Sequence, residues 1–259
     1  MIVANSLSRK YQCDSSGNKE FISVDNVSFT LLPNSSYSLV GESGSGKSTL
    51  SLMLSAILPP SEGTIYFNDK DIWKMNKKEL LAMRKDMQLV LQDSSGALNP
   101  RKKICESLYE PISKLCHLDK AEINSLILST LQKVELPETV LSKYPHELSG
   151  GQQSRVCIAR AICVNPKYII FDESVSGLDS TVRKKILDLL IDIRIQNNIT
   201  YLFITHDIDV ALYMANHIFV MKGGKIVEEI PNAVSYDSFH GEYSRELINA
   251  LPPKSPYDR

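Results

Sequence analysis

The chain has 259 residues, 43% of them apolar, which is enough for one large α/β domain with a small subdomain or tail. Its 29 Lys and Arg residues are balanced by 30 Asp and Glu residues, which gives a formal charge of −1. Because nucleic-acid binding normally needs an excess of positive charge to neutralise phosphates, we expect no nucleic-acid partner.

No stretch of the sequence predicts a membrane span or a secretory leader. The longest apolar stretch, residues 50–58, is interrupted by serines and ends at two prolines, whereas a spanning helix needs about 20 predominantly apolar residues. The first residues lack the basic segment and long apolar run of a secretory signal. The five cysteines form no CxxC pair, which fits reduced, mostly buried thiols. We therefore expect the chain to stay in the cytosol.

Strand-like and helix-like patterns alternate along the chain. Short apolar runs broken by turn residues predict strands, and apolar residues at helical spacing predict helices. In chain order we expect strands within residues 20–40, a helix from Lys47 to Pro59-Pro60, a strand over 63–68, a mainly helical block over about 100–164, a fully buried strand at 168–171, a helix over 180–196 and a strand at 201–204. This alternation indicates an α/β fold with a parallel sheet covered by helices on both faces.

The first chemical motif is a phosphate loop. Gly41-Glu42-Ser43-Gly44-Ser45-Gly46-Lys47-Ser48 matches G-x-x-x-x-G-K-[ST], with a predicted strand before it and a predicted helix from Thr49 after it. Glycines let consecutive backbone N–H groups turn towards phosphates, and the helix N-terminus adds its positive dipole end. Lys47 would reach the β- and γ-phosphates, and the Ser48 hydroxyl would ligate Mg²⁺. Residues Gly41 to Thr49 therefore form the predicted site for ATP, although such a loop alone leaves kinases and GTPases open.

Two acidic residues, Asp172 and Glu173, follow the predicted buried strand at the end where ligands of parallel sheets bind. Asp172 is placed to hold Mg²⁺, directly or through water, and Glu173 is placed to polarise the attacking water as general base. The alternative is that both acids cap a strand into solvent. A phosphate loop in the same chain favours the catalytic interpretation.

A third motif, Leu148-Ser149-Gly150-Gly151-Gln152, precedes a helical run. The hydroxyl of Ser149, the free backbone N–H groups of the glycines and the helix dipole would all face an anion. LSGGQ lying between a phosphate loop and an apolar strand that ends in Asp-Glu resembles the arrangement of the ABC ATPases.

Further elements resemble that family in the expected order. The resemblance makes Gln92 the Q-loop glutamine that senses Mg²⁺ and water, and Ser176-Gly177-Leu178-Asp179 the D-loop that crosses to a partner subunit. It makes His206 the switch histidine at the γ-phosphate and Tyr11 the aromatic residue that stacks on adenine. Judged singly, His206 is as well explained as a satisfied surface or core histidine, and Tyr11 as a packing residue of an N-terminal strand.

The resemblance implies a P-loop NTPase with a RecA-like parallel-sheet core, an N-terminal antiparallel β subdomain and an inserted α-helical subdomain. The expected division is 1–92 with 165–230 for the ATP-binding core, 93–164 for the helical signature subdomain and 231–259 for a short tail. The family pairs two ATPase subunits head to tail, so Ser149, Gly150, Gly151 and Gln152 would contact ATP held by the partner. The catalytic set would be Lys47, Gln92, Glu173 and His206, and the Mg²⁺ set Ser48, Gln92 and Asp172.

Within the family, residues 92–101 (QDSSGALNPR) and 243–252 (YSRELINALP) resemble stretches of peptide and nickel importer ATPases. That branch implies a heterodimer of two homologous ATPases on the cytoplasmic face of the membrane, two membrane permease subunits and an extracytoplasmic substrate-binding protein. Arg101 and the Ser48-Thr49-Leu50 run resemble the second ATPase of the pair. The short tail, with no Cys beyond Cys163, and Ser94 favour import of nickel or another metal, free or chelated; oligopeptide import is the alternative.

Two other classes of ATPase are alternatives, and three positions differ from the family pattern. A chromosome-maintenance ATPase would need a long coiled coil, for which residues 93–147 are too few, and an ABC ATPase serving a soluble assembly remains the less favoured alternative. Ser174 stands where the family usually has Pro, Gln153-Ser154 where it has Arg-Gln, and Gly177 where Ala is common. None of these removes a group that would touch phosphate.

Overall fold

The fold comes from a computed structural model, which describes residues 1–12, 20–91, 94–175 and 178–251. The strands are β1 (Ile2–Gln12), β2 (Glu20–Leu31), β3 (Ser36–Val40), β4 (Glu62–Phe67), β5 (Lys70–Asp71), β6 (Met87–Val90), β7 (Tyr168–Asp172), β8 (Thr200–Thr205), β9 (His217–Lys222) and β10 (Lys225–Pro231). The helices are α1 (Lys47–Leu54), α2 (Lys77–Asp86), α3 (Ser94–Ala97), α4 (Ile104–Leu115), α5 (Lys120–Lys133), α6 (Gly150–Ile162), α7 (Ser180–Asn197), α8 (Ile208–Met214) and α9 (Glu242–Asn249).

The described strands form two sheets. The larger has the order β10-β9-β3-β8-β7-β6, and the smaller has the order β2-β1-β4-β5. All neighbours in the larger sheet are parallel except β10 and β9, whereas the smaller sheet is antiparallel. The predicted α/β class, with a parallel core sheet, an N-terminal antiparallel sheet and inserted helices, is confirmed.

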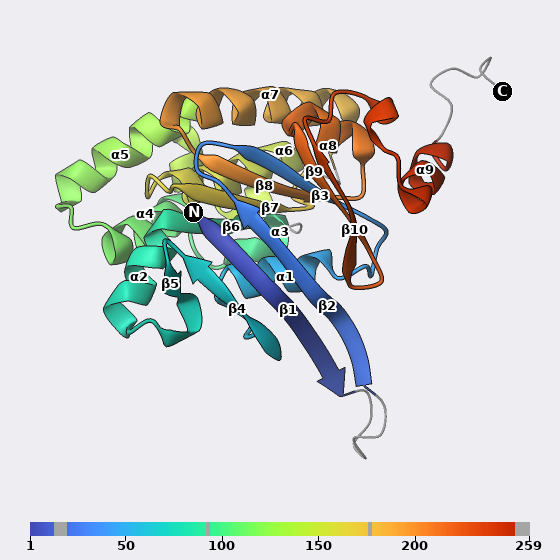
Figure 1. The fold of residues 1–259 in the computed structure, drawn as a ribbon. Helices are drawn as coiled ribbons and strands as arrows, with labels where there is room; N and C mark the ends of the chain where they lie inside the picture. Colours follow the sequence, from blue (N-terminus) through green and yellow to red (C-terminus); the bar gives the residue numbers. More distant parts are fainter. Residues whose placement is uncertain (13–19, 92–93, 176–177, 252–259) are drawn as a thin grey trace.

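Each face of the parallel sheet packs against its own core, and β7 shows how. Tyr168 and Ile170 face the core shared with α1 and the antiparallel sheet, while Ile169 and Phe171 face the core shared with α6 and α7. Alternation along a strand that is buried on both sides explains the unbroken apolar run in the sequence. Accordingly, α1 lies between the two sheets, and α7 and α8 lie on the other face of the parallel sheet (Figure 1).

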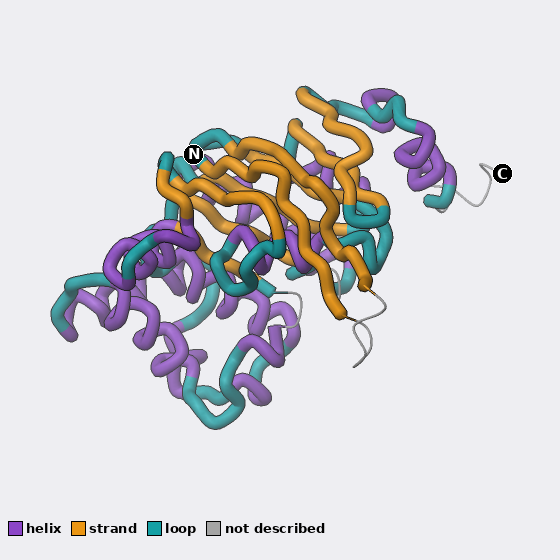
Figure 2. Tube along the Cα trace, turned by 60° about the horizontal axis from the view of Figure 1, so that its bottom comes forward, coloured by secondary structure: helices purple, strands orange, loops and turns teal. Residues whose placement is uncertain are grey.

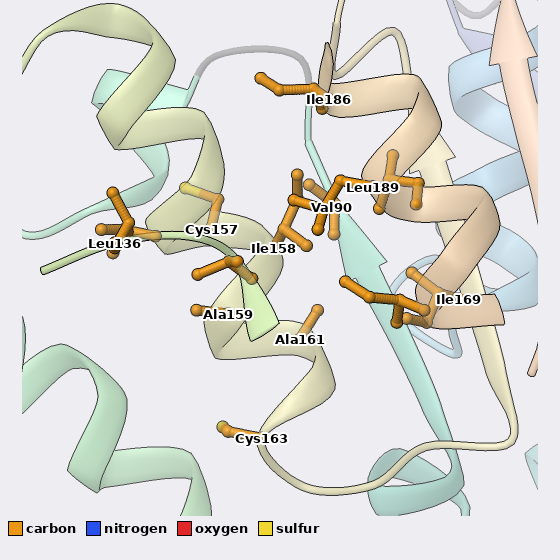
Figure 3. Packing of buried hydrophobic residues seen from close by; sticks show 14 of the residues in the cluster. Val90, Leu136, Cys157, Ile158, Ala159, Ala161, Cys163, Ile169, Ile186 and Leu189 are labelled. Carbon is orange, nitrogen blue, oxygen red and sulfur yellow. The ribbon is translucent and has the colours of Figure 1, made fainter. Parts of the chain in front are cut away.

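The helices between β6 and β7 share the second of these cores. Ile158 of α6 lies against Val90 of β6 and Leu189 of α7 (Figure 3). Figure 2 shows the strands gathered at the centre of the molecule and most helices around them. Because one apolar cluster runs through both the block and the sheet, the division at residues 92/93 and 164/165 stays a prediction.

A third, smaller cluster joins β3, α8 and β9 to the segment that follows β10. Ala233, Phe239 and Tyr243 of that segment are buried, with exposed fractions of 3%, 3% and 7%. The predicted tail therefore packs on the core and includes α9. None of the helices in the described ranges is both long and apolar enough to cross a membrane.

Several elements differ from the sequence prediction. The first helix ends at Leu54, before the prolines that were expected to stop it, because Ala56 adopts a left-handed conformation (φ 52°) and Ile57 N–H bonds to Leu52 O at 3.0 Å. This is the geometry of a Schellman helix end. Helix α2, strand β6, helix α8 and strands β9 and β10 were not predicted.

The aromatic contacts at the centre of the sheet give a stability prediction. Phe203 is 1% exposed, and its ring stacks on Phe171 with centroids 4.5 Å apart. We expect Phe203→Ala to lower the free energy of unfolding by about 3–5 kcal/mol, because a large buried ring is lost and a cavity remains. Ile195→Ala, at a side chain that is 60% exposed, should change it by less than about 0.5 kcal/mol. Urea unfolding followed by circular dichroism would test this, and equal effects of the two changes would contradict the assigned core.

Candidate nucleotide-binding site

Three predicted motifs meet at one edge of the parallel sheet. Val40, the last residue of β3, pairs with Thr205 at the end of β8, and Asp172 at the end of β7 pairs with Ile204. The phosphate loop, the Asp172-Glu173 pair and His206 therefore leave the sheet side by side. This carboxyl edge is where open parallel sheets bind their ligands.

The phosphate loop is held from behind by backbone. A Cβ on Gly46 would lie 2.1 Å from Ser23 O, and Gly46 has a φ of +106°, which favours glycine. A hydrogen bond of 3.0 Å from Gly224 N to Ser45 O and one of 2.8 Å between the hydroxyls of Ser23 and Thr49 tie the loop to β2 and to the β9–β10 turn. On the other side Gly44 has no heavy atom within 4 Å of an added Cβ. The loop therefore packs against β2 and the β9–β10 turn on one side and is open at Gly44 on the other.

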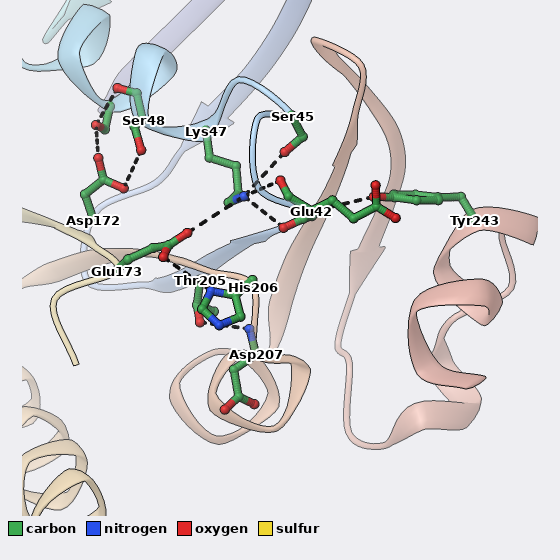
Figure 4. A network of polar contacts seen from close by, with 12 residues as sticks. Glu42, Ser45, Lys47, Ser48, Asp172, Glu173, Thr205, His206, Asp207 and Tyr243 are labelled. Carbon is green, nitrogen blue, oxygen red and sulfur yellow. Dashed lines mark hydrogen bonds and ion pairs between the residues drawn. The ribbon is translucent and has the colours of Figure 1, made fainter. Parts of the chain in front are cut away.

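The ammonium group of Lys47 is buried beneath this loop. The side chain is 4% exposed, and Nζ donates to Gly41 O and Glu42 O at 2.8 Å each (Figure 4). Its nearest carboxylate oxygen in an ion pair is Glu173 Oε1, at 4.0 Å. Burial removes water from the charged form and so lowers the pKa of Lys47, with Glu173 and Asp172 opposing the shift. A dehydrated cation behind an open loop fits a phosphate group.

Oxygen atoms suited to Mg²⁺ gather beside Lys47. Ser48 Oγ donates to Asp172 Oδ1 at 3.1 Å, and Ser51 Oγ donates to Oδ2 at 2.8 Å. Burial raises the pKa of Asp172, and the two hydroxyl hydrogen bonds oppose the shift. A buried carboxylate next to a hydroxyl is the hard oxygen donor set that Mg²⁺ prefers, so these residues fit the predicted metal.

Glu173 stands between two predicted catalytic residues. Its carboxylate lies 4.0 Å from Lys47 Nζ through Oε1 and 3.3 Å from His206 Nδ1 through Oε2. Its backbone is left-handed (φ 47°), and its N–H bonds to Ile204 O at 2.9 Å. A non-glycine residue in this region stores strain and is characteristic of functional sites. His206, 55% exposed, follows β8 and is held only loosely.

The LSGGQ motif lies at the start of α6, outside this cluster. Ser149 and Gln152 form a capping box: Gln152 N donates to Ser149 Oγ at 3.3 Å, and Ser149 N donates to Gln152 Oε1 at 3.1 Å. Gly150 is exposed, and a Cβ there would meet nothing within 4 Å. In the described part of the chain no hydrogen bond or ion pair joins Ser149, Gly150, Gly151 or Gln152 to residues 41–49. The motif thus presents an exposed helix N-terminus that is capped by its own Ser149 and Gln152.

The remaining predicted residues have the following positions. Asp179 caps α7, with Oδ1 accepting from Thr181 N and Val182 N at 3.1 and 3.0 Å. Tyr11 lies near the end of β1, opposite Phe21 of β2, with the Arg9 guanidinium 4.9 Å from its ring centre. Gln92 and the D-loop residues Ser176 and Gly177 lie outside the described residues.

The departures from the family pattern have structural roles of their own. Gln153 Nε2 donates to Pro145 O at 2.9 Å and to Leu148 O at 3.2 Å, so it fixes the segment before the motif. Ser174, where Pro was expected, is 6% exposed, and its hydroxyl makes no hydrogen bond within the described residues. Its position beside Glu173 leaves one buried hydroxyl unsatisfied at the site.

Sequence reasoning missed Ser51. This residue is completely buried one helical turn after Ser48, and it supplies the shorter of the two hydrogen bonds to Asp172. The i, i+3 spacing of the two serines on the predicted helix was the available signal, because residues at that spacing share a helix face.

Comparisons with solved structures agree with this arrangement. Two dimeric structures of MJ0796, a bacterial ABC transporter cassette, have a TM-score of 0.81 and 30% and 29% identity, over 90% of this chain and 99% of theirs. The second of these was bound to ADP and Pi. CbiO1 from Clostridium perfringens, part of the ABC transporter complex cbiONQ, has a TM-score of 0.76 and 26% identity, over 96% of this chain and 90% of that one.

Relatives in sequence are import proteins. The metal-staphylopine import system ATP-binding protein CntF of Staphylococcus aureus is 41% identical over 87% of this chain and 88% of the relative. The glutathione import ATP-binding protein GsiA of Escherichia coli K12 is 40% identical over 92% of this chain, which spans only 38% of that relative's length. A family model described as ABC transporter matches residues 24–176. With this match, and with phosphate loop, acidic pair and LSGGQ placed as they are, the chain belongs to the ABC transporter ATP-binding family.

Proposed function

We propose that this chain is the ATP-hydrolysing subunit of an ABC importer. The observation that carries the proposal is the cluster at the carboxyl edge of the sheet, where Lys47, Glu173 and His206 adjoin the Ser48–Asp172 pair. A buried ammonium, a buried carboxylate and a glutamate with a left-handed backbone rarely lie this close together for structural reasons alone. ATP hydrolysis accounts for all three.

Each residue has a defined role in this proposal. The backbone of residues 41–49 and the Lys47 ammonium bind the phosphates, and Tyr11 stacks on adenine. Ser48 and Asp172, with Gln92, would hold Mg²⁺, and the ion would supply positive charge to neutralise the phosphate oxygens. Glu173 takes the proton of the attacking water, and His206 stabilises the γ-phosphate. The left-handed backbone of Glu173 aims its carboxylate across the loop, towards Lys47.

The site is completed by a second, homologous ATPase subunit. Ser149 and Gly150 are exposed, and among the described residues no hydrogen bond joins them to the phosphate loop, so this helix N-terminus is accessible to ATP bound by the partner. Asp179 lies next to this surface, since a Cβ on Gly151 would approach Val182 of the helix that Asp179 caps to 3.0 Å. The dimeric form of MJ0796 supports a pair of ATPase subunits. We propose that the pair is a heterodimer in which this chain is the second member.

The proposed cargo is nickel or another transition metal, free or as a chelate. The CntF relative, named for metal-staphylopine import, supports a metal complex, and the GsiA relative, named for glutathione import, supports the peptide alternative. In either case two permease subunits span the membrane, an extracytoplasmic binding protein delivers the cargo, and this chain works on the cytoplasmic face. Failure to co-purify with a membrane protein would instead favour an ABC ATPase that serves a soluble assembly.

Glu173→Gln should keep ATP binding and lower hydrolysis by about 100-fold or more, because the general base is lost while the shape of the side chain is kept. Phosphate release by the assembled complex would measure this, with an accumulated ATP-bound dimer as the second readout. Lys47→Ala is the matched control that should lose nucleotide binding itself. Wild-type hydrolysis by Glu173→Gln would show that another group is the base.

Cargo class can be tested in cells. In a strain whose only copy carries Glu173→Gln, grown under metal limitation, we expect the content of one of nickel, cobalt and zinc to fall relative to the wild type. Elemental analysis of washed cells would measure it, and re-expression of the wild-type chain should restore it. Unchanged contents of all three metals would favour the peptide alternative.

The proposed Mg²⁺ site predicts a difference between Ser51 of α1 and Ser55, the residue that caps its C-terminus. Ser51→Ala removes a hydrogen bond to Asp172 Oδ2, so we expect the Mg²⁺ concentration for half-maximal ATPase activity to rise about tenfold or more, as for one hydrogen bond to a charged group. Ser55→Ala removes only a hydrogen bond to Ser51 O and should leave the Mg²⁺ dependence unchanged. Identical Mg²⁺ titrations for the two variants would contradict a positioning role for Ser51.

A further inference from the structure

The segment after β10 packs next to the phosphate loop. Phe239 and Tyr243 belong to the same apolar cluster as Val40, the residue before Gly41, and Ile208, the first residue of α8. The segment thus lies next to the ends of β3 and β8, two of the three strands that carry the candidate site. In Figure 4 the helix carrying Tyr243 lies on the side of the loop opposite Asp172.

Helix α9 is fixed in position at its N-terminus. The Glu228 carboxylate on β10 accepts hydrogen bonds from His240 N at 2.8 Å and Gly241 N at 2.9 Å, and a further one from the Ser244 hydroxyl. A carboxylate at a helix N-terminus satisfies otherwise unpaired N–H groups and opposes the helix dipole. The first turn of α9, which includes Tyr243, therefore has a defined place on the core.

The Tyr243 ring is also fixed. Lys222 Nζ lies 4.1 Å from the ring centre and 3.5 Å from Glu246 Oε2, one turn further along α9. The side chain is 7% exposed, and its hydroxyl reaches the loop, where it accepts a hydrogen bond from Glu42 N at 3.3 Å. A rigid aromatic side chain thereby connects α9 to the backbone of the phosphate loop.

The Tyr243 hydroxyl bonds to a peptide group that also bonds to Lys47. The N–H of Glu42 and the C=O of Gly41 belong to one planar amide, so fixing one end fixes the other. Gly41 O accepts from Lys47 Nζ at 2.8 Å. One amide therefore bonds to Tyr243 through its N–H and to the Lys47 ammonium through its C=O. Rotation of that peptide would break both hydrogen bonds, and Lys47 Nζ would lose one of its two carbonyl acceptors at 2.8 Å.

We propose that Tyr243 is a positioning residue for nucleotide binding: its hydroxyl sets the plane of the Gly41–Glu42 peptide and, through it, the position of the Lys47 ammonium. The inference rests on the proposed function of the phosphate loop. It adds a residue that lies 196 positions away from Lys47 in the chain and outside the matched family region, residues 24–176. The C-terminal helix is then a part of the ATP site that sets the affinity for phosphates.

The test compares two tyrosines of the same segment. Tyr243→Phe keeps the ring under Lys222 and removes only the hydroxyl, and we expect ATP with Mg²⁺ to bind the full chain about twofold to tenfold more weakly by calorimetry, the effect of one hydrogen bond. Tyr236→Phe removes a comparable hydroxyl, which donates to Asp209 on α8, whereas the Tyr243 hydroxyl accepts from the loop. It should lower the melting temperature to a similar extent and leave ATP affinity unchanged.

The outcomes separate this inference from the proposed function. If the wild type binds ATP, Lys47→Ala does not, and Tyr243→Phe binds as tightly as the wild type, the positioning role is wrong while the ATP site stands. Equal losses of affinity in Tyr243→Phe and Tyr236→Phe would show general loosening of the segment and would also overturn it. If the wild type and Lys47→Ala bind ATP alike, the proposed function itself fails. A selective loss in Tyr243→Phe supports the inference.

Discussion

The buried ammonium of Lys47 is the constraint on which the rest of the site depends. A charged group that is 4% exposed loses most of its hydration, and carbonyl oxygens at 2.8 Å replace it only in part. The carboxylates of Glu173 and Asp172 compensate from a distance, and both carry a cost of their own: strained backbone for the first and burial for the second. In the proposed function, phosphate would supply negative charge beside Lys47 and Mg²⁺ positive charge beside Asp172, so their binding would offset the burial of both groups.

The sequence predicted those parts of the fold and site that depend on local pattern. The loop of residues 41–49, the strand that ends at Asp172 and the helix cap at Ser149 each follow from residue types within about ten positions. Helix α2 was missed because it is largely polar and buries only Met83, and β6 because it has four residues, of which only two are fully buried. The early end of α1 was missed because Ala56, an ordinary helix former, takes a left-handed conformation that no local residue announces. The contact of Tyr243 with Glu42 spans 201 positions and follows only from the tertiary fold.

The three described motifs in the candidate site differ in how firmly they are held. The phosphate loop is fixed by the backbone hydrogen bond from Gly224, the hydroxyl of Ser23 and the hydroxyl of Tyr243. In contrast, His206 is half exposed, and Ser149 lies at a helix end with no hydrogen bond to the loop among the described residues. A firmly held phosphate loop beside the exposed His206 and Ser149 fits the proposed site, in which a second subunit makes the remaining contacts. In the proposed dimer two half-sites would share both ATP molecules, and closure of the pair would order His206 and the LSGGQ motif, which would tie hydrolysis to assembly.

The packing of the C-terminal segment extends this logic. The apolar cluster of this segment includes Val40, which precedes the loop, and Ile208, which follows His206. Helix α9 therefore packs next to both strand ends. The segment is held to β10 by three hydrogen bonds to Glu228 and to the loop by one hydrogen bond from Glu42 N to the Tyr243 hydroxyl. Because a packed core does not deform smoothly, loss of that one bond would leave the segment in place on β10 and free only the Gly41–Glu42 peptide. The proposed positioning role of Tyr243 therefore acts on the loop without requiring movement of α9.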